Sequence, residues 1–223
     1  MRTTVTDPRA AKSRPGLQTD AAKGRYHHGD LREALITAAM ELVLERGAEN
    51  FTLADACRRA GVSTAAPYKH FRDRDEVLEI VLQRGFDLMT EEADAAVAQA
   101  GPGTFAAMIA LNKHYVLFAI KRPSLFKLMF GQSPELKQAD LVLEQGQDCF
   151  GRVVKHFADY CEAAGIAEDP MQVCLRTWTF VHGLASLKID EDYDAVAPDL
   201  DHMALLTDTL PLLLQDGMAS GAR

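Results

Sequence analysis

The chain has 223 residues, of which 48% are hydrophobic and 25% charged, a balance typical of a folded globular protein and not of a disordered or fibrous one. Its N-terminus has no apolar signal core, and its longest uncharged run, residues 95–112, is interrupted by Gly101-Pro102-Gly103. These features exclude a membrane span in that run, and we expect a cytoplasmic protein with no membrane partner.

Positive and negative charges are segregated along the chain. Residues 1–75 carry 13 Lys or Arg and 10 Asp or Glu, a net charge of +3, whereas the remaining residues carry 11 basic and 22 acidic side chains, a net charge of −11. A basic head on an acidic body attracts phosphate through one face and repels it elsewhere. Two solvated surfaces of different composition would give the same totals, so charge alone leaves the partner open.

The chemistry-bearing residues form no catalytic pattern. The four cysteines, Cys57, Cys149, Cys161 and Cys174, are widely spaced without a CxxC pair, which favours buried, reduced thiols over disulfides or metal ligands. The sequence contains no GxSxG, HExxH or Gly-rich phosphate-binding motif. We therefore expect no enzyme, no catalytic residues, no metal and no cofactor.

The chain begins with a segment, residues 1–25, that has six basic side chains and almost no apolar periodicity. This composition predicts a disordered basic arm, which either lies along DNA or serves only as a solubilising tail. The following segment, residues 30–47, has apolar residues at helical spacing. Asp30 as its N-cap and Gly47 as its stop predict the first helix.

Residues 52–71, TLADACRRAGVSTAAPYKHF, have the pattern of two short helices joined by a tight turn. Thr52 is expected to cap the first helix, residues 53–60, with Asp55 as its reciprocal partner, and Gly61 supplies the turn. This is the pattern of a helix-turn-helix motif, whose second helix fits the major groove of B-DNA. Such motifs also occur in helical proteins that never contact DNA.

The second helix is predicted over residues 64–71 with Ser63 as its N-cap. Its small residues allow close approach to thymine methyl groups, Lys69 can reach a guanine edge or a phosphate, and the Tyr68 hydroxyl can bond to a phosphate oxygen. The residues predicted to contact DNA are Thr52, Ser63, Thr64, Ala65, Ala66, Tyr68, Lys69, His70 and Arg74.

Every later element is predicted to be helical, because no stretch alternates convincingly between polar and apolar side chains. A long helix over residues 74–100 begins at a capping box of Asp73 and Glu76 and links the two halves of the chain. The fold class is therefore all-α, with a three-helix helix-turn-helix domain, residues 26–75, followed by a larger helical domain, residues 76–223. Further helices are predicted over residues 104–121, 124–130, 133–164, 170–189 and 199–216.

Residues 26–88 resemble the DNA-binding domain of TetR-family transcriptional regulators. The segment AGVSTAAPYKHFRDRDEVL carries the resemblance through its turn, its Tyr and His-Phe, and the basic Arg74 that opens the next helix. Ala56, Cys57 and Pro67 depart from the residues usual in the family, but none of these changes removes a group that faces DNA.

Two later segments resemble the C-terminal domain of the WHG type in this family. They are YVLFAIKRPSLFKLMFG, residues 115–131, and WTFVHG, residues 178–183. The resemblance implies a homodimer that binds a palindromic DNA operator and a small-molecule effector of unknown identity. It also implies that the last two long helices form the dimer interface.

The second domain contains many bulky apolar side chains, which either line an apolar cavity or form packed core. The residues predicted to bind a ligand are Phe105, Met108, Tyr115, Phe118, Met129, Trp178 and His182. The residues predicted to form the dimer interface are Leu206, Leu210 and Leu213, which lie near the chain end, where little chain remains to cover them.

Three functional hypotheses follow from these patterns. The first is a ligand-responsive, homodimeric transcriptional regulator, a repressor released from a palindromic operator by a small, mainly apolar molecule. The second is a DNA-binding protein without an effector, whose body only dimerises or binds another protein. The third, a helical enzyme or carrier, is the least favoured.

Overall fold

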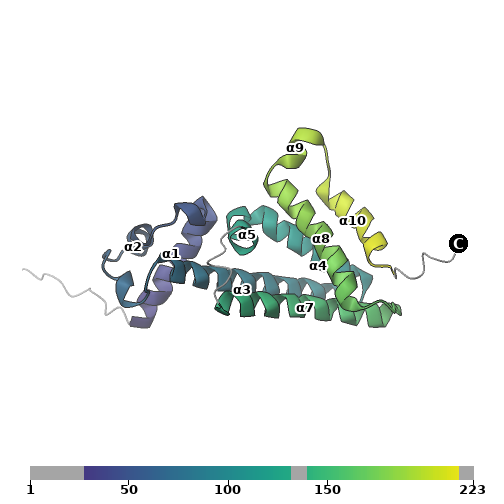
Figure 1. The fold of residues 1–223 in the computed structure, drawn as a ribbon, viewed down its shortest axis with the longest axis horizontal. Coiled ribbons are helices and arrows are strands. Elements are labelled where there is room, and N and C mark those ends of the chain that lie inside the picture. Colours follow the sequence, from purple (N-terminus) through teal and green to yellow (C-terminus); the bar gives the residue numbers. More distant parts are fainter. Residues whose placement is uncertain (1–27, 132–139, 216–223) are drawn as a thin grey trace, which may run out of the picture.

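The computed structural model describes residues 28–131 and 140–215, and every regular element in these ranges is helical, which confirms the predicted all-α class. The molecule is elongated (Figure 1). A head at one end contains α1 (His28–Arg46), the 3₁₀ turn η1 (Ala48–Asn50) and α2 (Leu53–Ala60). The body contains α3 (Arg74–Ala100), α4 (Phe105–Lys121), α5 (Pro123–Phe130), α7 (Asp140–Ala164), α8 (Pro170–Ile189), α9 (Asp192–Val196) and α10 (His202–Leu213).

The helix boundaries are set by side-chain caps and by glycine. At the start of α3, Asp73 accepts the backbone N–H of Glu76 at 2.9 Å, and the Glu76 carboxylate accepts the backbone N–H of Arg72 at 2.7 Å. The Asp73 side chain thus satisfies one of the N–H groups that the first helical turn leaves without a partner, and Glu76 holds the residue that precedes the cap. The helix ends at Gly101, whose φ of 94° is a conformation that favours glycine.

Two helix starts and one additional helix differ from the sequence-based expectation. Helix α1 begins at His28, so Asp30 lies within its first turn instead of capping it. Helix α10 begins at His202 because the Asp201 side chain accepts two backbone N–H groups at 2.9 Å. The short helix α9 was not predicted. The predicted arm, residues 1–25, and the predicted start of the helix over residues 133–164 lie outside the described residues.

One hydrophobic cluster joins the head to the body. Leu35 of α1, Val81 of α3 and Phe126 of α5 are all buried members of it. Helix α5 contacts both α1 and α3, so it fills the junction between head and body. A second cluster lies farther along the body and contains buried residues from α3, α4, α7, α8 and α10. Helix α3 contributes to both clusters and runs the length of the body beside α7 (Figure 1).

Two further contacts define this junction, a close packing of α5 side chains against α3 within the body and an ion pair between body and head. A Cβ atom at Gly85 of α3 would lie 3.1 Å from both the Leu125 Cδ1 and the Met129 Sδ atoms of α5. The absence of a side chain at this position therefore lets the two helices pack closely. Near it, the Arg84 guanidinium of α3 pairs with Glu33 of α1.

The predicted dimer residues on the last helix require a correction. Leu206 and Leu210 are fully buried in the chain's own second cluster, and Leu213 is partly buried. The first two are therefore unavailable to a second copy of the chain, because α8 and α4 of the same chain already pack against α10. The apolar residue that α10 does expose is Leu212, with 70% of its surface accessible.

We predict that the two helical positions Gly85 and Gly151 respond oppositely to alanine. Gly85→Ala should lower the free energy of unfolding by about 1 kcal/mol, because the added Cβ overpacks the junction between α3 and α5. Gly151→Ala is the matched control, since no atom lies within 4 Å of its added Cβ. It should raise that free energy by about 0.5–1 kcal/mol through the lower entropy of the unfolded chain.

Urea denaturation of both variants at one protein concentration measures the difference. Equal effects of the two substitutions would show that the close approach at Gly85 does not constrain the junction.

Candidate functional site

The helix-turn-helix begins as the sequence predicts. The Thr52 hydroxyl accepts the backbone N–H of Asp55 at 3.1 Å and donates to the Asp55 carboxylate at 2.8 Å. The hydroxyl, together with Arg58, holds the pKa of Asp55 below its usual value. Gly61 then ends α2 with a φ of 70°, as expected for a left-handed C-cap. Arg59 binds Glu45 of α1 with two contacts of 2.6 and 2.5 Å, which fixes α2 against α1.

The prediction of a regular recognition helix over residues 64–71 is wrong. The segment forms a turn followed by a single 3₁₀ turn, η2 (Pro67–Lys69). Pro67 has no backbone N–H, so the Ser63 carbonyl accepts the N–H of Ala66 at 3.0 Å instead of the one four residues ahead. Neither the predicted Ser63 cap nor any other side-chain cap precedes η2 in the described hydrogen bonds.

The side chains predicted to contact DNA still lie together on this short segment. Ser63, Thr64, Ala65, Tyr68 and Lys69 are exposed, and Tyr68 has 67% of its surface accessible, which is high for an aromatic residue. Ala66 and His70 are partly buried.

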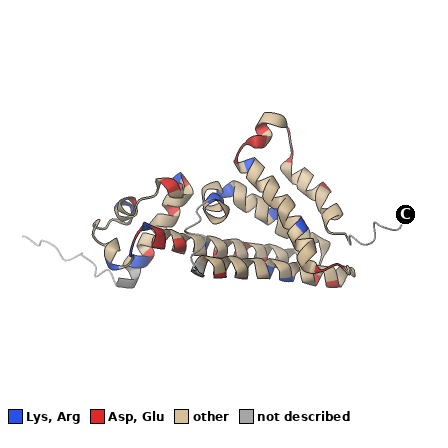
Figure 2. Ribbon diagram, viewed as in Figure 1, with Lys and Arg blue, Asp and Glu red and all other residues tan. Residues whose placement is uncertain are grey.

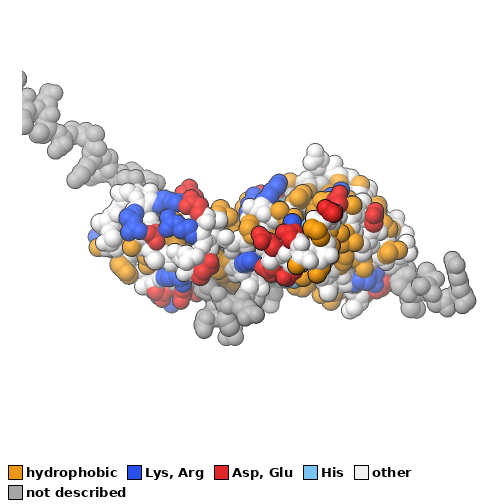
Figure 3. All heavy atoms as spheres, turned by 90° about the horizontal axis from the view of Figure 1, so that it is seen from above, with side chains coloured by type: hydrophobic (Ala, Val, Ile, Leu, Met, Phe, Trp, Pro, Cys, Tyr) orange, Lys and Arg blue, Asp and Glu red, His pale blue; other side chains and the backbone are white. Residues whose placement is uncertain are grey.

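The charge on the head is mixed. Figure 2 shows Lys, Arg, Asp and Glu on the head helices. Several of the acidic side chains are paired with arginines of neighbouring elements, including Glu33 with Arg84 and Glu45 with Arg59. Figure 3 shows Lys and Arg side chains on the head and a group of Asp and Glu side chains on the nearby part of the body.

Arg74, which the sequence predicted to contact DNA, makes several bonds inside the head. Its Nε donates to the Phe51 carbonyl at 3.0 Å, a second nitrogen donates to the Ala48 carbonyl, and the guanidinium lies over the Phe51 ring. Arg74 therefore positions the chain that leads into α2. A phosphate contact from its remaining exposed edge stays a prediction.

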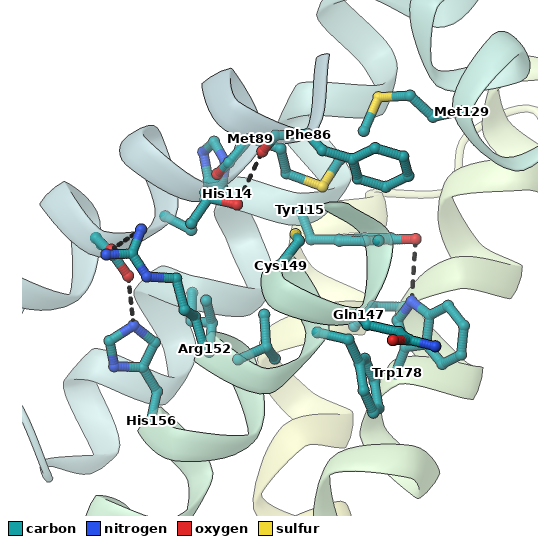
Figure 4. Close-up of a pocket in the computed structure, with 18 of the residues that line it drawn as sticks. Phe86, Met89, His114, Tyr115, Met129, Gln147, Cys149, Arg152, His156 and Trp178 are labelled. Carbon is teal, nitrogen blue, oxygen red and sulfur yellow. Dashed lines mark hydrogen bonds and ion pairs between the residues drawn. The ribbon is translucent and has the colours of Figure 1, made fainter. Parts of the chain in front are cut away.

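The body contains a cavity of about 450 Å³ lined by residues of α3, α4, α5, α7 and α8. Figure 4 shows Phe86, Met129 and Trp178 on one side of it and His114, Arg152 and His156 on the other. A volume of this size is typical of pockets that bind small organic molecules.

Three of the seven predicted ligand residues line this cavity, namely Tyr115, Met129 and Trp178. The other four predicted residues do not line the cavity. Met108 and Phe118 are buried in the two hydrophobic clusters on the other faces of α4, and Phe105 lies at the start of α4 with 42% of its surface exposed. His182 lies behind the cavity wall, where it contacts Tyr115.

The lining supplied by α3 was not predicted from the sequence. Phe86, Met89 and Ala93 of α3 lie on one helical face that points into the cavity, and Phe157 of α7 also lines it. The spacing of these apolar residues was visible in the sequence. It could not distinguish a face that lines a cavity from a face that packs against another helix.

Tyr115 forms the centre of a hydrogen-bonded group in the cavity wall. The phenol oxygen accepts the indole N–H of Trp178 at 3.1 Å and lies 2.8 Å from His182 Nδ1 (Figure 4 draws the first contact). Burial raises the pKa of Tyr115 well above its usual value, so the phenol stays neutral. This group ties α4 to α8 through three residues of the segments that carry the family resemblance.

The other side of the cavity is polar. The Asp94 carboxylate of α3 binds His156 Nε2 at 2.7 Å and the Arg152 guanidinium at 3.3 Å, and both of these partners lie on α7. His114 Nε2 lies 3.2 Å from the Met89 carbonyl, and burial lowers the pKa of His114. Burial also raises the pKa of the Cys149 thiol, which keeps it protonated.

The described residues hold no group of three or more His, Cys, Asp or Glu side chains placed to bind a metal ion. The four cysteines are free thiols. None of the helices in residues 28–131 and 140–215 combines the length and apolar character needed to cross a membrane.

Two family profiles match the chain. One, described as bacterial regulatory proteins of the tetR family, matches residues 35–81, and one described as a tetracyclin repressor-like C-terminal domain matches residues 108–210. The chain therefore belongs to the TetR family of bacterial regulatory proteins. This membership confirms the predicted family and the expectation that the chain is a regulatory protein and not an enzyme.

Individual proteins agree with this assignment. A solved structure of a protein of unknown function from Rhodococcus sp. RHA1 is 30% identical, with a TM-score of 0.73 over 86% of this chain and 97% of that one. An uncharacterised HTH-type transcriptional regulator of Haemophilus influenzae is 27% identical over 130 residues, which are 57% of this chain and 60% of that relative. The structure of RolR in complex with resorcinol has a TM-score of 0.59 at 17% identity, over 86% and 91% of the two chains, and shows the same fold.

We predict that Tyr115→Phe lowers the free energy of unfolding by about 1–3 kcal/mol, because it leaves the Trp178 N–H without its buried acceptor. Tyr193→Phe is the control, since the Tyr193 hydroxyl makes no hydrogen bond within the described residues, and it should change stability by less than about 0.5 kcal/mol.

Trp178 is the only tryptophan in the chain, so its emission reports on the same bond. An emission spectrum unchanged by Tyr115→Phe would mean that the Tyr115 contact does not hold the indole.

Proposed function

We propose that the protein is a homodimeric, DNA-binding transcriptional repressor, which a small, mainly apolar molecule releases from a palindromic operator. The observation that carries the proposal is the cavity of about 450 Å³, whose walls include the helices that pack against the head. DNA is the proposed partner, and we therefore place the action of the protein in the cytoplasm.

The segment after α2 supports the DNA-binding part of the proposal. Thr64, Tyr68 and Lys69 project from the head without a covering helix. The short 3₁₀ turn still presents these side chains within one stretch, which suits insertion into a major groove. Lys69 and Thr64 are placed to read base edges, whereas the Tyr68 hydroxyl suits a phosphate.

The cavity supports the effector over the effector-free alternative. A body that served only for dimerisation would need packed helices and no internal space, and an empty volume in the core is destabilising. RolR, which shares this fold, holds resorcinol in its solved structure. By analogy, we propose that the cavity of the present chain also binds a small organic molecule.

The exposed apolar residues of α8 and α10 support dimerisation. Met171 and Leu175, four residues apart near the start of α8, and Leu187 near its end are each exposed, and Leu212 is exposed on α10. A second copy of the chain, related by a two-fold axis, would cover these side chains with its own, and would match the symmetry of a palindromic operator.

The route from cavity to DNA runs through α3 and α5. Met129 of α5 lines the cavity and belongs to the cluster that the head shares, and the same is true of Phe86 and Met89 of α3. A ligand that moves either helix changes how the head is held. Two recognition segments must keep one separation to fit a palindrome, so a coupling of about 1–3 kcal/mol is enough to regulate binding.

We predict that Leu187→Glu with Leu212→Glu yields monomers that keep their helical content and lose operator binding, because each added carboxylate would be buried without a partner in the dimer. Light scattering, circular dichroism and anisotropy of a labelled duplex from the DNA upstream of the gene measure the three properties. Glu144→Gln, an exposed change on α7, is the control.

For the unmodified protein, the logarithm of the binding constant should fall with the logarithm of salt concentration with a slope of about −5 or steeper. A slope near zero, or equal affinity for random DNA, would exclude the proposed operator binding. Dimers that persist in the Glu double variant would exclude the proposed interface.

A further inference from the structure

We propose that the effector is an organic cation, a molecule with an apolar, largely aromatic body and a protonated amine that faces the gap between α3 and α7. This inference rests on the proposed function, because it names the chemistry of the molecule that the same cavity would take.

The cavity calls for an amphiphilic molecule. Figure 4 shows the aromatic and thioether side chains of Phe86, Met129 and Trp178 on one side, and the polar side chains of Arg152 and His156 at the opposite end. An entirely apolar molecule would suit the apolar lining but would make no hydrogen bond with the polar side chains at the opposite end. A ligand with one polar end fits both parts.

The side-chain amide of Asn112 offers a hydrogen-bond acceptor to a ligand in the cavity. Asn112 lines the cavity with only 4% of its surface exposed, and its Nδ2 donates to the Met108 carbonyl at 2.8 Å. A carbonyl can only accept, so this bond fixes the orientation of the amide. The Oδ1 atom of Asn112 then accepts no hydrogen bond from any described residue, and it can accept one from a ligand in the cavity that Asn112 lines.

Thr90 also lines the cavity, but its hydroxyl is already bonded within the chain. It donates to the Phe86 carbonyl at 2.8 Å and is also a hydrogen-bond partner of the Cys149 thiol. The acceptor left for a ligand is therefore Asn112 Oδ1. A ligand with an N–H group satisfies this atom, whereas a carboxylate, which only accepts, does not.

The charges around the opening favour a positive ligand. A polar hollow between α3 and α7 shares Thr90, Gln147, Cys149 and Arg152 with the cavity, so the two spaces adjoin. Its walls carry three exposed carboxylates, Asp87, Glu91 and Asp148, which we call the acidic mouth. None of the three forms an ion pair within the described part of the chain.

The basic side chains near the acidic mouth are already neutralised. Arg152 pairs with Asp94 at 3.3 Å, and Lys155 pairs with Asp159 at 2.9 Å. His156 binds the same Asp94 carboxylate. An anionic ligand would have to pass three unpaired carboxylates and remove Arg152 from its partner. A cationic ligand is attracted electrostatically by each carboxylate it approaches, and it disturbs no existing ion pair.

The test uses four probes built on one phenylbutyl frame, which differ only in the end group. They are the primary amine, its trimethylammonium derivative, the neutral alcohol and the carboxylate. Binding to the full chain is followed at neutral pH by quenching of Trp178, the only tryptophan, whose indole lines the cavity. The amine should bind at least about tenfold more tightly than the carboxylate, as expected for a few partly exposed charges.

Two sets of variants separate charge from hydrogen bonding. Neutralising the acidic mouth, with Asp87→Asn, Glu91→Gln and Asp148→Asn together, should weaken both cations by about tenfold and leave the alcohol unchanged. Asn112→Leu should weaken the amine and the alcohol by about fivefold but not the trimethylammonium probe, which has no N–H. Asp208→Asn, an exposed change on α10, should alter none of the four affinities.

The outcomes distinguish this inference from the proposed function. A carboxylate that binds as tightly as the amine, or an amine preference that survives neutralisation of the acidic mouth, overturns the cationic class while leaving the cavity as a binding site. An amine that quenches Trp178 without changing operator affinity supports the class and overturns the proposed function. If none of the four probes quenches Trp178, both are overturned.

Discussion

The structure depends on the packing of α5 into the junction between head and body. Phe126 and Met129 of this helix belong to the same buried cluster as Leu35 of α1 and Val81 of α3. Protein cores are packed too densely to deform continuously. A displacement of α5 or α3 must therefore either move the head as a unit or open a void next to it. The head cannot reorient independently of the helices that line the cavity.

This arrangement carries the proposed coupling between the cavity and the DNA-binding surface of the head. Met129 and Phe130 reach the cavity from α5, while Phe86 and Met89 reach it from α3. Both helices pack against α1, and the absence of a side chain at Gly85 lets α5 side chains pack against α3. Two routes from the cavity thus converge on one helix of the head. The ion pair between Arg84 and Glu33 lies at the same junction and adds a polar restraint to the apolar one.

The fold could be predicted from the sequence to a large extent because its signals are local. Caps such as Asp73, glycine stops such as Gly101, and apolar residues at helical spacing fixed most helix boundaries. The sequence predicted a regular recognition helix over residues 64–71, and this prediction was wrong. Pro67 has no backbone N–H, so the segment forms a 3₁₀ turn instead. The short helix α9 has no strong apolar pattern of its own.

The functional sites were predicted less completely because they depend on how helices are rotated against one another. Periodicity identifies Met108 and Phe118 as inward-facing but does not say whether they face a cavity or a neighbouring helix. The same limit applies to Leu206 and Leu210, which the sequence marks as apolar and the structure places in the chain's own core. The acceptor on Asn112 and the three carboxylates of the acidic mouth come together only in three dimensions.

The measurement that tests the coupling of cavity and head most directly is the affinity of the phenylbutylamine probe for the full-length protein with and without saturating operator duplex. Thermodynamic linkage requires that the operator weaken probe binding by the same factor by which the probe weakens operator binding. We predict a reduction of about 5- to 150-fold, which corresponds to a coupling free energy of about 1–3 kcal/mol. Equal probe affinities in the two conditions would contradict the coupling through α3 and α5.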